Sequence, residues 1–143
     1  FFPSVAMMPS TIKLRAKARE FSRSHDTRLE PAVRRLYPEV EFSTRNIENV
    51  ELIGSEISKQ LAALALLLSK NPLDTDKLWI CDCGFAVTFA WIKAFENSLG
   101  LIVDWPDEVK QYDSRLLGFK IVSDELSGYL PAMNKYLEKA FPV

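Results

Sequence analysis

The sequence is poor in the residues from which metal centres and most active sites are built. Its 143 residues include one histidine, two cysteines and only five glycines. Two cysteines separated by a single residue cannot form the disulfide framework of a small secreted domain, and we expect them to be reduced thiols in a cytoplasmic protein. The low glycine count favours helices over a sheet, which would need many tight turns.

The sequence also lacks an excess of charge of either sign and a long uninterrupted apolar run. Its net charge is −1, with 26% charged and 48% hydrophobic residues, which is typical of a folded globular domain. This balance favours neither nucleic acid nor an anionic membrane as a partner. The apolar stretches around residues 61–68 and 78–92 are too short or too interrupted to span a bilayer. Residues 1–10 do not have the features of a signal peptide.

Apolar residues recur at helical spacing through the first third of the chain. Residues 1–10 carry two prolines and no periodicity, which predicts an extended lead-in. A helix is expected to begin at Ser10 or Thr11, which are good N-caps. Pro31 lies inside the apolar stripe, so we expect a kink or a break there. The stripe of this predicted helix is Leu14, Ala18, Phe21, His25, Leu29, Ala32 and Leu36.

Further helices are predicted after a loop at residues 37–46. One runs from about residue 47 to 69, and the next, over roughly 79–98, is apolar almost all round, as expected of a helix buried at the centre of a domain. Pro106 is expected near the first position of another helix. A last helical stretch follows residues 122–124 and is expected to be interrupted or restarted at Pro131.

No strand-like alternation and no internal repeat is found. The predicted fold is therefore all-α, with about five or six helices around one buried helix. We expect residues 11–143 to form a single helical domain.

The segment Cys81-Asp82-Cys83 is the strongest candidate for a metal or redox site. Zinc needs about four ligands, and His25 is the only other soft ligand in the chain. Two thiols at this spacing also point in roughly opposite directions on a helix. We therefore predict no metal site and interpret the cysteines as small apolar residues of a buried helix.

Asp82 has a structural interpretation instead. An acid in the first turn of a helix accepts hydrogen bonds from free backbone N–H groups. If Asp82 is the third residue of the helix, Trp79 is the N-cap and its backbone N–H is the donor. Trp79 has no hydroxyl, so only half of a capping box is predicted.

Two features of the first predicted helix admit more than one interpretation. His25 lies on the apolar stripe beside Asp26 and is interpreted as a core residue with one hydrogen bond, because no nucleophile can be assigned to it. We predict no catalytic residue. Arg15, Arg19 and Arg23 form a basic row, which is either a solvated face or a groove that contacts an anionic ligand or a neighbouring subunit.

Taken in order, these features resemble the C-terminal helical domain of the glutathione transferase superfamily. "FFPSVAMMPST" is similar to the family's interdomain linker, and "LRAKAREFSRSHDTRLEPAVRRLYP" to the first helix of that domain, with its Arg-Ala opening and an aspartate halfway. "IENVELIGSEISKQLAALALLLSKNPLD" looks like the second helix. "LWICDCGFAVTFAWIKAF" resembles the central helix, and "DWPDEVKQYDSRLLGF" the helix after it, with its proline, aromatic residue and arginine.

The sequence departs from the family pattern at two places. The family's signature at the start of the central helix is Ser/Thr-x-x-Asp, whereas Trp79 takes the place of the Ser or Thr here. "RLLGFK" replaces the Arg-Pro-x-Val step that is common after the next helix. Both differences indicate a divergent branch.

The resemblance implies a division of labour between two domains. A thioredoxin-like N-terminal domain, which lies outside this sequence, would bind glutathione and supply the catalytic residue. This chain would form the wall of the apolar co-substrate pocket and much of a homodimer interface. Asp26, with Glu20 as the alternate, would contact the glutathione of the neighbouring subunit, and Asp82 would be the buried cap. The pocket wall would include Arg19, Ser22, Arg23 and Trp91.

Two alternatives remain open at this point. One is that the chain is a non-catalytic transferase-like domain used for protein–protein assembly. The other is that it is an unrelated helical bundle without a ligand.

Overall fold

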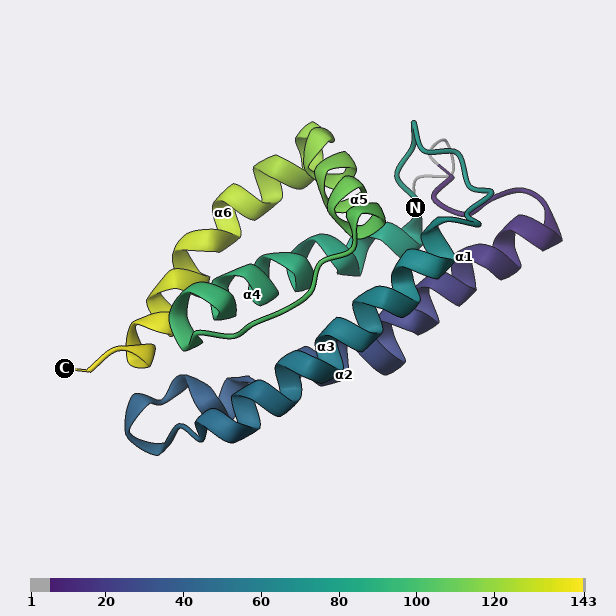
Figure 1. Cartoon of the computed structure of the whole chain (residues 1–143). Helices are drawn as coiled ribbons and strands as arrows, with labels where there is room; N and C mark the ends of the chain where they lie inside the picture. The colour runs from purple at the N-terminus through teal and green to yellow at the C-terminus, as the bar shows by residue number, and fades with distance from the viewer. Residues whose placement is uncertain (1–5, 143) are drawn as a thin grey trace.

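The computed structural model describes residues 6–142, and over this range all regular structure is helical (Figure 1). The all-α prediction is therefore confirmed. Residues 1–5 of the predicted lead-in lie outside the described range, and residues 6–10 form no helix. The elements are α1 (Ile12–Ser24), a π-helical turn (His25–Leu29), α2 (Glu30–Arg34), α3 (Ile47–Leu68), α4 (Cys83–Leu99), α5 (Asp107–Gly118) and α6 (Lys120–Leu137).

The first helix begins as the sequence predicts but passes Pro31 without a break. Thr11 is its N-cap, and the Thr11 Oγ1 accepts a hydrogen bond from the Leu14 N–H at 3.3 Å. Directly before Pro31 the helix widens into the π turn, in which the Glu30 N–H donates to the His25 carbonyl. A proline ring clashes with the carbonyl four residues earlier in a regular α-helix. The wider turn relieves that clash, so the helix continues past Pro31 without the break that was one of the two expected outcomes.

α4 lies between two groups of helices and supplies much of the core. Figure 1 shows α5 and α6 on one side of α4, and α1, α2 and α3 on the other. Phe85, Phe89, Ile92 and Phe95 of α4 are fully buried. Gly100 ends the helix in the left-handed conformation, at φ 69°, which glycine adopts without strain.

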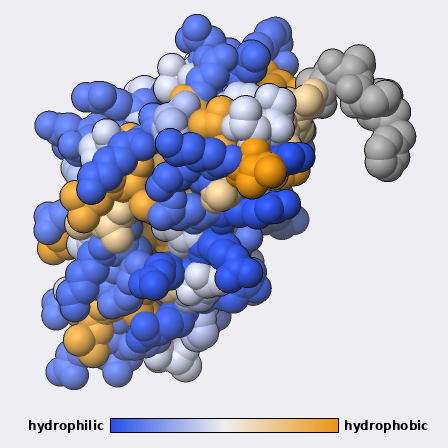
Figure 2. All heavy atoms as spheres, turned by 90° about the vertical axis from the view of Figure 1, so that its right-hand side faces the viewer, coloured by the Kyte–Doolittle hydropathy of each residue, from blue (hydrophilic) through white to orange (hydrophobic). Residues whose placement is uncertain are grey.

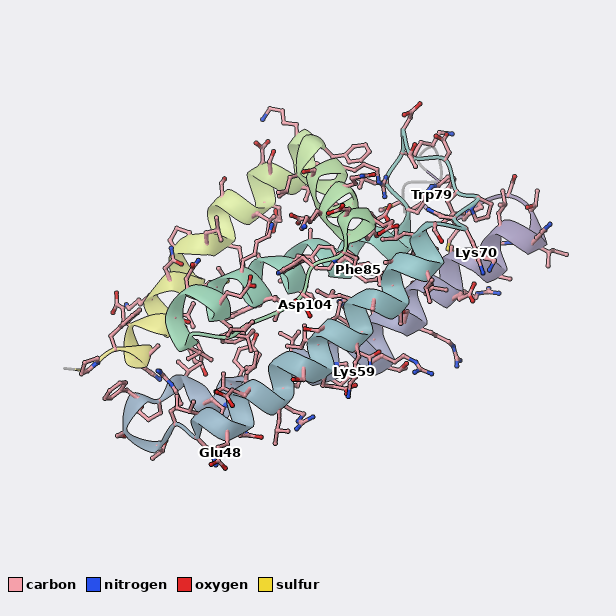
Figure 3. The ribbon with its side chains drawn as sticks, in the orientation of Figure 1. Glu48, Lys59, Lys70, Trp79, Phe85 and Asp104 are labelled. Atoms are coloured by element: carbon pink, nitrogen blue, oxygen red, sulfur yellow. The ribbon has the colours of Figure 1, made fainter. Side chains whose placement is uncertain are left out.

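α3 buries one stripe and exposes the rest of its surface. Its buried apolar residues recur at helical spacing and are Val50, Ile53, Ile57, Leu61, Leu64 and Ala65. Ile47, the first residue of the helix, lies outside this stripe and is 55% exposed. Figure 3 shows Glu48 and Lys59 along the outer side of α3, whereas Phe85 lies in the interior.

α5 and α6 follow each other with a sharp turn at Phe119. Pro106 is the N-cap of α5, and its carbonyl accepts from the N–H groups of Val109 and Lys110 at 3.0 Å each. The predicted interruption at Pro131 is wrong, because α6 runs continuously through this residue. Pro131 is exposed, and on the open side of a helix solvent can satisfy the carbonyl that loses its partner.

The surface is mixed rather than dominated by one apolar face. The side of the molecule in Figure 2 is mainly hydrophilic, with separate apolar patches between charged side chains. Among residues 6–142, no helix combines the length and the apolar character needed to cross a bilayer.

Candidate functional site

Asp82 is buried at the start of α4, and its carboxylate joins that start to α5. Its Oδ2 accepts a hydrogen bond from the Trp79 backbone N–H at 2.8 Å, the contact that a third-position acid makes. Its Oδ1 accepts from the Tyr112 hydroxyl at 2.6 Å and from the Arg115 guanidinium at 3.0 Å. The Asp82 side chain is 5% exposed. All of its polar contacts are internal, so this carboxylate has a structural task.

The same cluster fixes the loop before α4. Arg115 also donates to the backbone carbonyls of Thr75 and Lys77, at 3.1 Å each. Burial and the charge of Asp82 raise the pKa of Tyr112 well above its ordinary value. The phenol therefore stays neutral and donates to the carboxylate throughout the physiological pH range.

Neither cysteine is poised for chemistry. Cys81 is buried and Cys83 is exposed. Burial, with a smaller effect of the Asp82 charge, raises the pKa of Cys81 to about 12 and also raises the pKa of Cys83. A thiol that stays protonated is a poor nucleophile and a poor metal ligand. Within residues 6–142, no cluster of three or more His, Cys, Asp or Glu side chains is placed to hold a metal ion.

His25, the first residue of the π turn, makes two side-chain hydrogen bonds, one of which reaches α4. Its Nδ1 lies 2.7 Å from Oδ1 of Asp26, and its Nε2 lies 2.8 Å from Oγ1 of Thr88. Because a carboxylate only accepts, Nδ1 carries the proton, and in the neutral ring Nε2 accepts from the threonine hydroxyl. The expectation of a single hydrogen bond is corrected to two, and Thr88 is a partner that sequence reasoning missed.

Gly84 makes room for the His25 ring on the surface of α4. A Cβ built at Gly84 would lie 2.5 Å from Cε1 of His25, so any side chain there would displace the ring. Gly84 and Thr88 are one turn apart and therefore share a helix face. A small residue and a hydroxyl at this spacing are the signal in the sequence that points to a polar partner packed on α4.

The order threonine, histidine, aspartate is also that of a nucleophile, its base and an orienting acid. Here Thr88 is 6% exposed and His25 is 8% exposed, so a substrate cannot reach the hydroxyl. The side chain of Asp26 is 66% exposed. Of these three side chains, only the Asp26 carboxylate is accessible to a ligand. His25 holds it in a fixed orientation through the hydrogen bond to Oδ1.

The other residues predicted for the pocket fall into separate groups. Arg19, Glu20 and Arg23 line a groove between α1 and α3, whereas Ser22 and Asp26 are not part of its lining. Glu20 pairs with Lys17 at 2.6 Å in this groove. Asp26 and Glu20, the two acids considered for the contact to glutathione, therefore lie in different surroundings.

Trp91 lies in the core and not in the groove. It is 7% exposed and packs against Tyr37 and Phe95, with ring centroids 4.9 and 5.2 Å away. Its indole N–H donates to the Tyr129 hydroxyl at 2.9 Å, which ties α4 to α6. The structure does not bring Trp91 together with Arg19 and Arg23.

Two other grooves were not predicted. One, of about 620 Å³, lies between α4 and α6 and contains the ion pair of Lys93 with Asp113. Its walls are mainly apolar, with Ala86, Ala90, Leu126, Leu130 and Met133 among them. The other, of about 610 Å³, lies between α3 and residues 99–106.

Comparisons with family models, with curated proteins and with solved structures give no match for this chain.

Proposed function

We propose that this chain is the helical domain of a glutathione-transferase-like protein, in which it forms the wall of an apolar co-substrate pocket and part of a homodimer interface. The observation that carries the proposal is the cluster of Asp82, Tyr112 and Arg115. These are the acid of the central-helix motif and the aromatic residue and arginine of the helix after it. Residues that the resemblance matched separately in the sequence are in contact here.

Asp26 is the residue we assign to glutathione. Its exposed carboxylate is oriented by His25, as an acceptor for an ammonium group should be. Glu20 is the weaker candidate because Lys17 already neutralises it. We therefore retain Asp26 as the contact to the glutathione amino group, with Ser22 one turn earlier on the same helix.

The position of the lead-in agrees with this assignment. The Met7 carbonyl accepts from the Ile80 N–H at 2.9 Å, just before α4. His25 packs over Gly84 in the first turn of α4. A thioredoxin-like domain joined through the lead-in would lie beside the start of α4, and Asp26 would contact the glutathione held by the same domain of the neighbouring subunit. That domain would lower the pKa of the glutathione thiol and present the thiolate to an apolar electrophile.

The test uses the full protein that the gene encodes. Conjugation of glutathione to 1-chloro-2,4-dinitrobenzene is measured for the native protein and for Asp26→Asn. Losing a charge-assisted hydrogen bond at an exposed site should raise KM for glutathione about 10-fold and leave kcat nearly unchanged. Asp124→Asn is the control, since Asp124 only pairs with Lys120 on the surface.

Two results would refute the proposal. One is a complete reading frame without a thioredoxin-like domain of about eighty residues upstream of Phe1. The other is a full protein that neither binds immobilised glutathione nor conjugates it.

The second candidate is a non-catalytic transferase-like domain used for protein assembly. It is favoured by the divergent start of α4, where Trp79 stands in place of the Ser or Thr of the family signature. A stable complex with a second protein in size-exclusion chromatography, together with no retention on immobilised glutathione, would support it over the first.

A further inference from the structure

The groove between α1 and α3 combines positive side chains with an exposed apolar floor. Its volume is about 1080 Å³. Leu66 and Leu67 of α3 line the floor, together with the small side chains of Ala16 and Ala63. Leu66 is 66% exposed, so the groove presents an apolar side chain that a ligand can reach.

The cations around this groove exceed the acids that could neutralise them. Among the described residues 6–142, Glu20 is the only acid in its lining, and it forms an ion pair with Lys17. Lys13, Arg19, Arg23 and Arg28 also line the groove, and none of the four forms an ion pair with any residue in the range 6–142. The net charge of the whole chain is −1, so this excess of positive charge is local to the groove.

The π turn places three arginines in one line along the groove. Arg19 and Arg23 are one regular turn apart, and the next position at that spacing would be Thr27. Because the π turn has one more residue than a regular turn, Arg28 lies next to Thr27 on the same side of the helix. Both residues line the groove. α3 packs against α5, α2 and the π turn and has few contacts with α1. The groove beside α1 is thereby left open.

We propose that this groove binds an acidic amphipathic α-helix of a partner protein. The apolar side of that helix lies on Leu66 and Leu67, and its carboxylates, one turn apart, pair with Arg19, Arg23 and Arg28. Within residues 6–142, the lining contains no aromatic side chain on which a nucleic-acid base could stack. A bilayer surface is flat on this scale and would leave the concave floor uncovered. The inference does not depend on glutathione binding.

The probe is a fluorescein-labelled helical peptide of about 16 residues with leucines on one face and glutamates at i, i+4 beside them. Its binding to the chain is measured by fluorescence anisotropy between about 0.05 and 0.3 M NaCl. We expect a Kd on the order of 10 μM at low salt, weakening by about 10-fold over this range. The same peptide with lysine in place of glutamate should not bind.

Charge reversal provides the matched comparison. Arg19→Glu with Arg23→Glu should weaken binding by about 30-fold or more, and Leu66→Gln by about 5-fold. Lys110→Glu with Lys120→Glu changes the net charge equally on α5 and α6 and should alter Kd less than about 2-fold. Circular dichroism verifies that each variant is folded. Asp26→Asn should bind the peptide like the native chain, which separates this test from the glutathione test.

Three outcomes would overturn the proposal. The acidic peptide does not bind, or it binds no better than the lysine peptide, or both double variants weaken it equally. A further outcome would identify another occupant. If the peptide does not bind, and sedimentation shows a dimer that the double variant Arg19→Glu with Arg23→Glu dissociates, then a second copy of the chain occupies the groove.

Discussion

Asp82 accepts three hydrogen bonds with one buried carboxylate, so its removal affects three neighbours at once. Asp82→Ala leaves the Tyr112 hydroxyl and the Arg115 guanidinium without their acceptor and the Trp79 N–H uncapped. We expect the free energy of unfolding to fall by about 2–4 kcal/mol, more than an exposed cap would cost. Urea denaturation followed by circular dichroism measures it.

The control for this substitution is Asp124→Ala. Asp124 pairs with Lys120 at 2.6 Å on the exposed surface of α6. An exposed pair of this kind contributes less than about 1 kcal/mol. Equal stability losses for the two variants would contradict the structural role of Asp82.

The thiols allow a second prediction for single residues. Because burial raises the pKa of Cys81 to about 12, only about one thiol in ten thousand is ionised at pH 8. Iodoacetamide should therefore modify the exposed Cys83 slowly and leave Cys81 unmodified until the chain unfolds, as mass spectrometry would show. Rapid modification of Cys81 in the folded protein would contradict its burial.

The same pKa shift has a consequence for stability. Folding raises the pKa of Cys81 from an ordinary value of 9.0 to about 12, so the folded state holds this proton more tightly. The resulting stabilisation is fully present below pH 9 and is lost as the pH rises from 9 towards 12.

For single residues, the sequence predicted the capping role of Asp82 but not the hydrogen bond between Thr88 and His25. An acid at the start of an apolar helix has few possible tasks, and its donor, the Trp79 N–H, is local in the chain. Thr88 is 63 residues from His25, and no local pattern specifies which helix faces pack together.

Among the elements, the π turn and α4 are in close contact where the His25 ring packs on Gly84. Alanine there would gain helix propensity, but its Cβ would lie within 3 Å of three atoms of the His25 ring. We expect Gly84→Ala to lower the free energy of unfolding by about 1–3 kcal/mol, because the displaced ring also loses its hydrogen bond to Thr88.

Gly128 of α6 is the matched control. A Cβ built there meets no atom within 4 Å. Gly128→Ala should therefore raise the free energy of unfolding by about 0.5–1 kcal/mol through helix propensity alone. Opposite signs for two identical substitutions in helices would identify the contact with His25 as the cause, and equal signs would contradict it.

The two prolines within helices show why the positions of the helices could be predicted better than the backbone geometry within them. The apolar periodicity specifies that α1–α2 and α6 are helical, and both are. A proline requires that the local backbone adjust, but the sequence does not say how: before Pro31 the helix widens, and at Pro131 it continues exposed to solvent.

For the whole molecule, the residues predicted for one site lie in separate surroundings in the structure. The arginine row and the neighbouring acids do lie on the surface of α1. The sequence could not separate Asp26 from Arg19 and Arg23, because this depends on where α3 and α4 pack around α1. Arg28 was missed because the π turn shifts it into line with the row.

The three tryptophans test whether the helices unfold as one unit. Trp79 precedes α4, Trp91 contacts Tyr129 of α6, and Trp105 lies 5.6 Å from Phe89, so together they report on three places along α4. Since α4 packs against α2, α5 and α6, we expect the urea midpoint measured by fluorescence for each variant that retains a single tryptophan to agree within about 0.2 M with the midpoint measured by circular dichroism for the same variant. An earlier transition at Trp91 alone would mean that α6 separates from α4 before the rest unfolds, along the groove that already lies between these two helices.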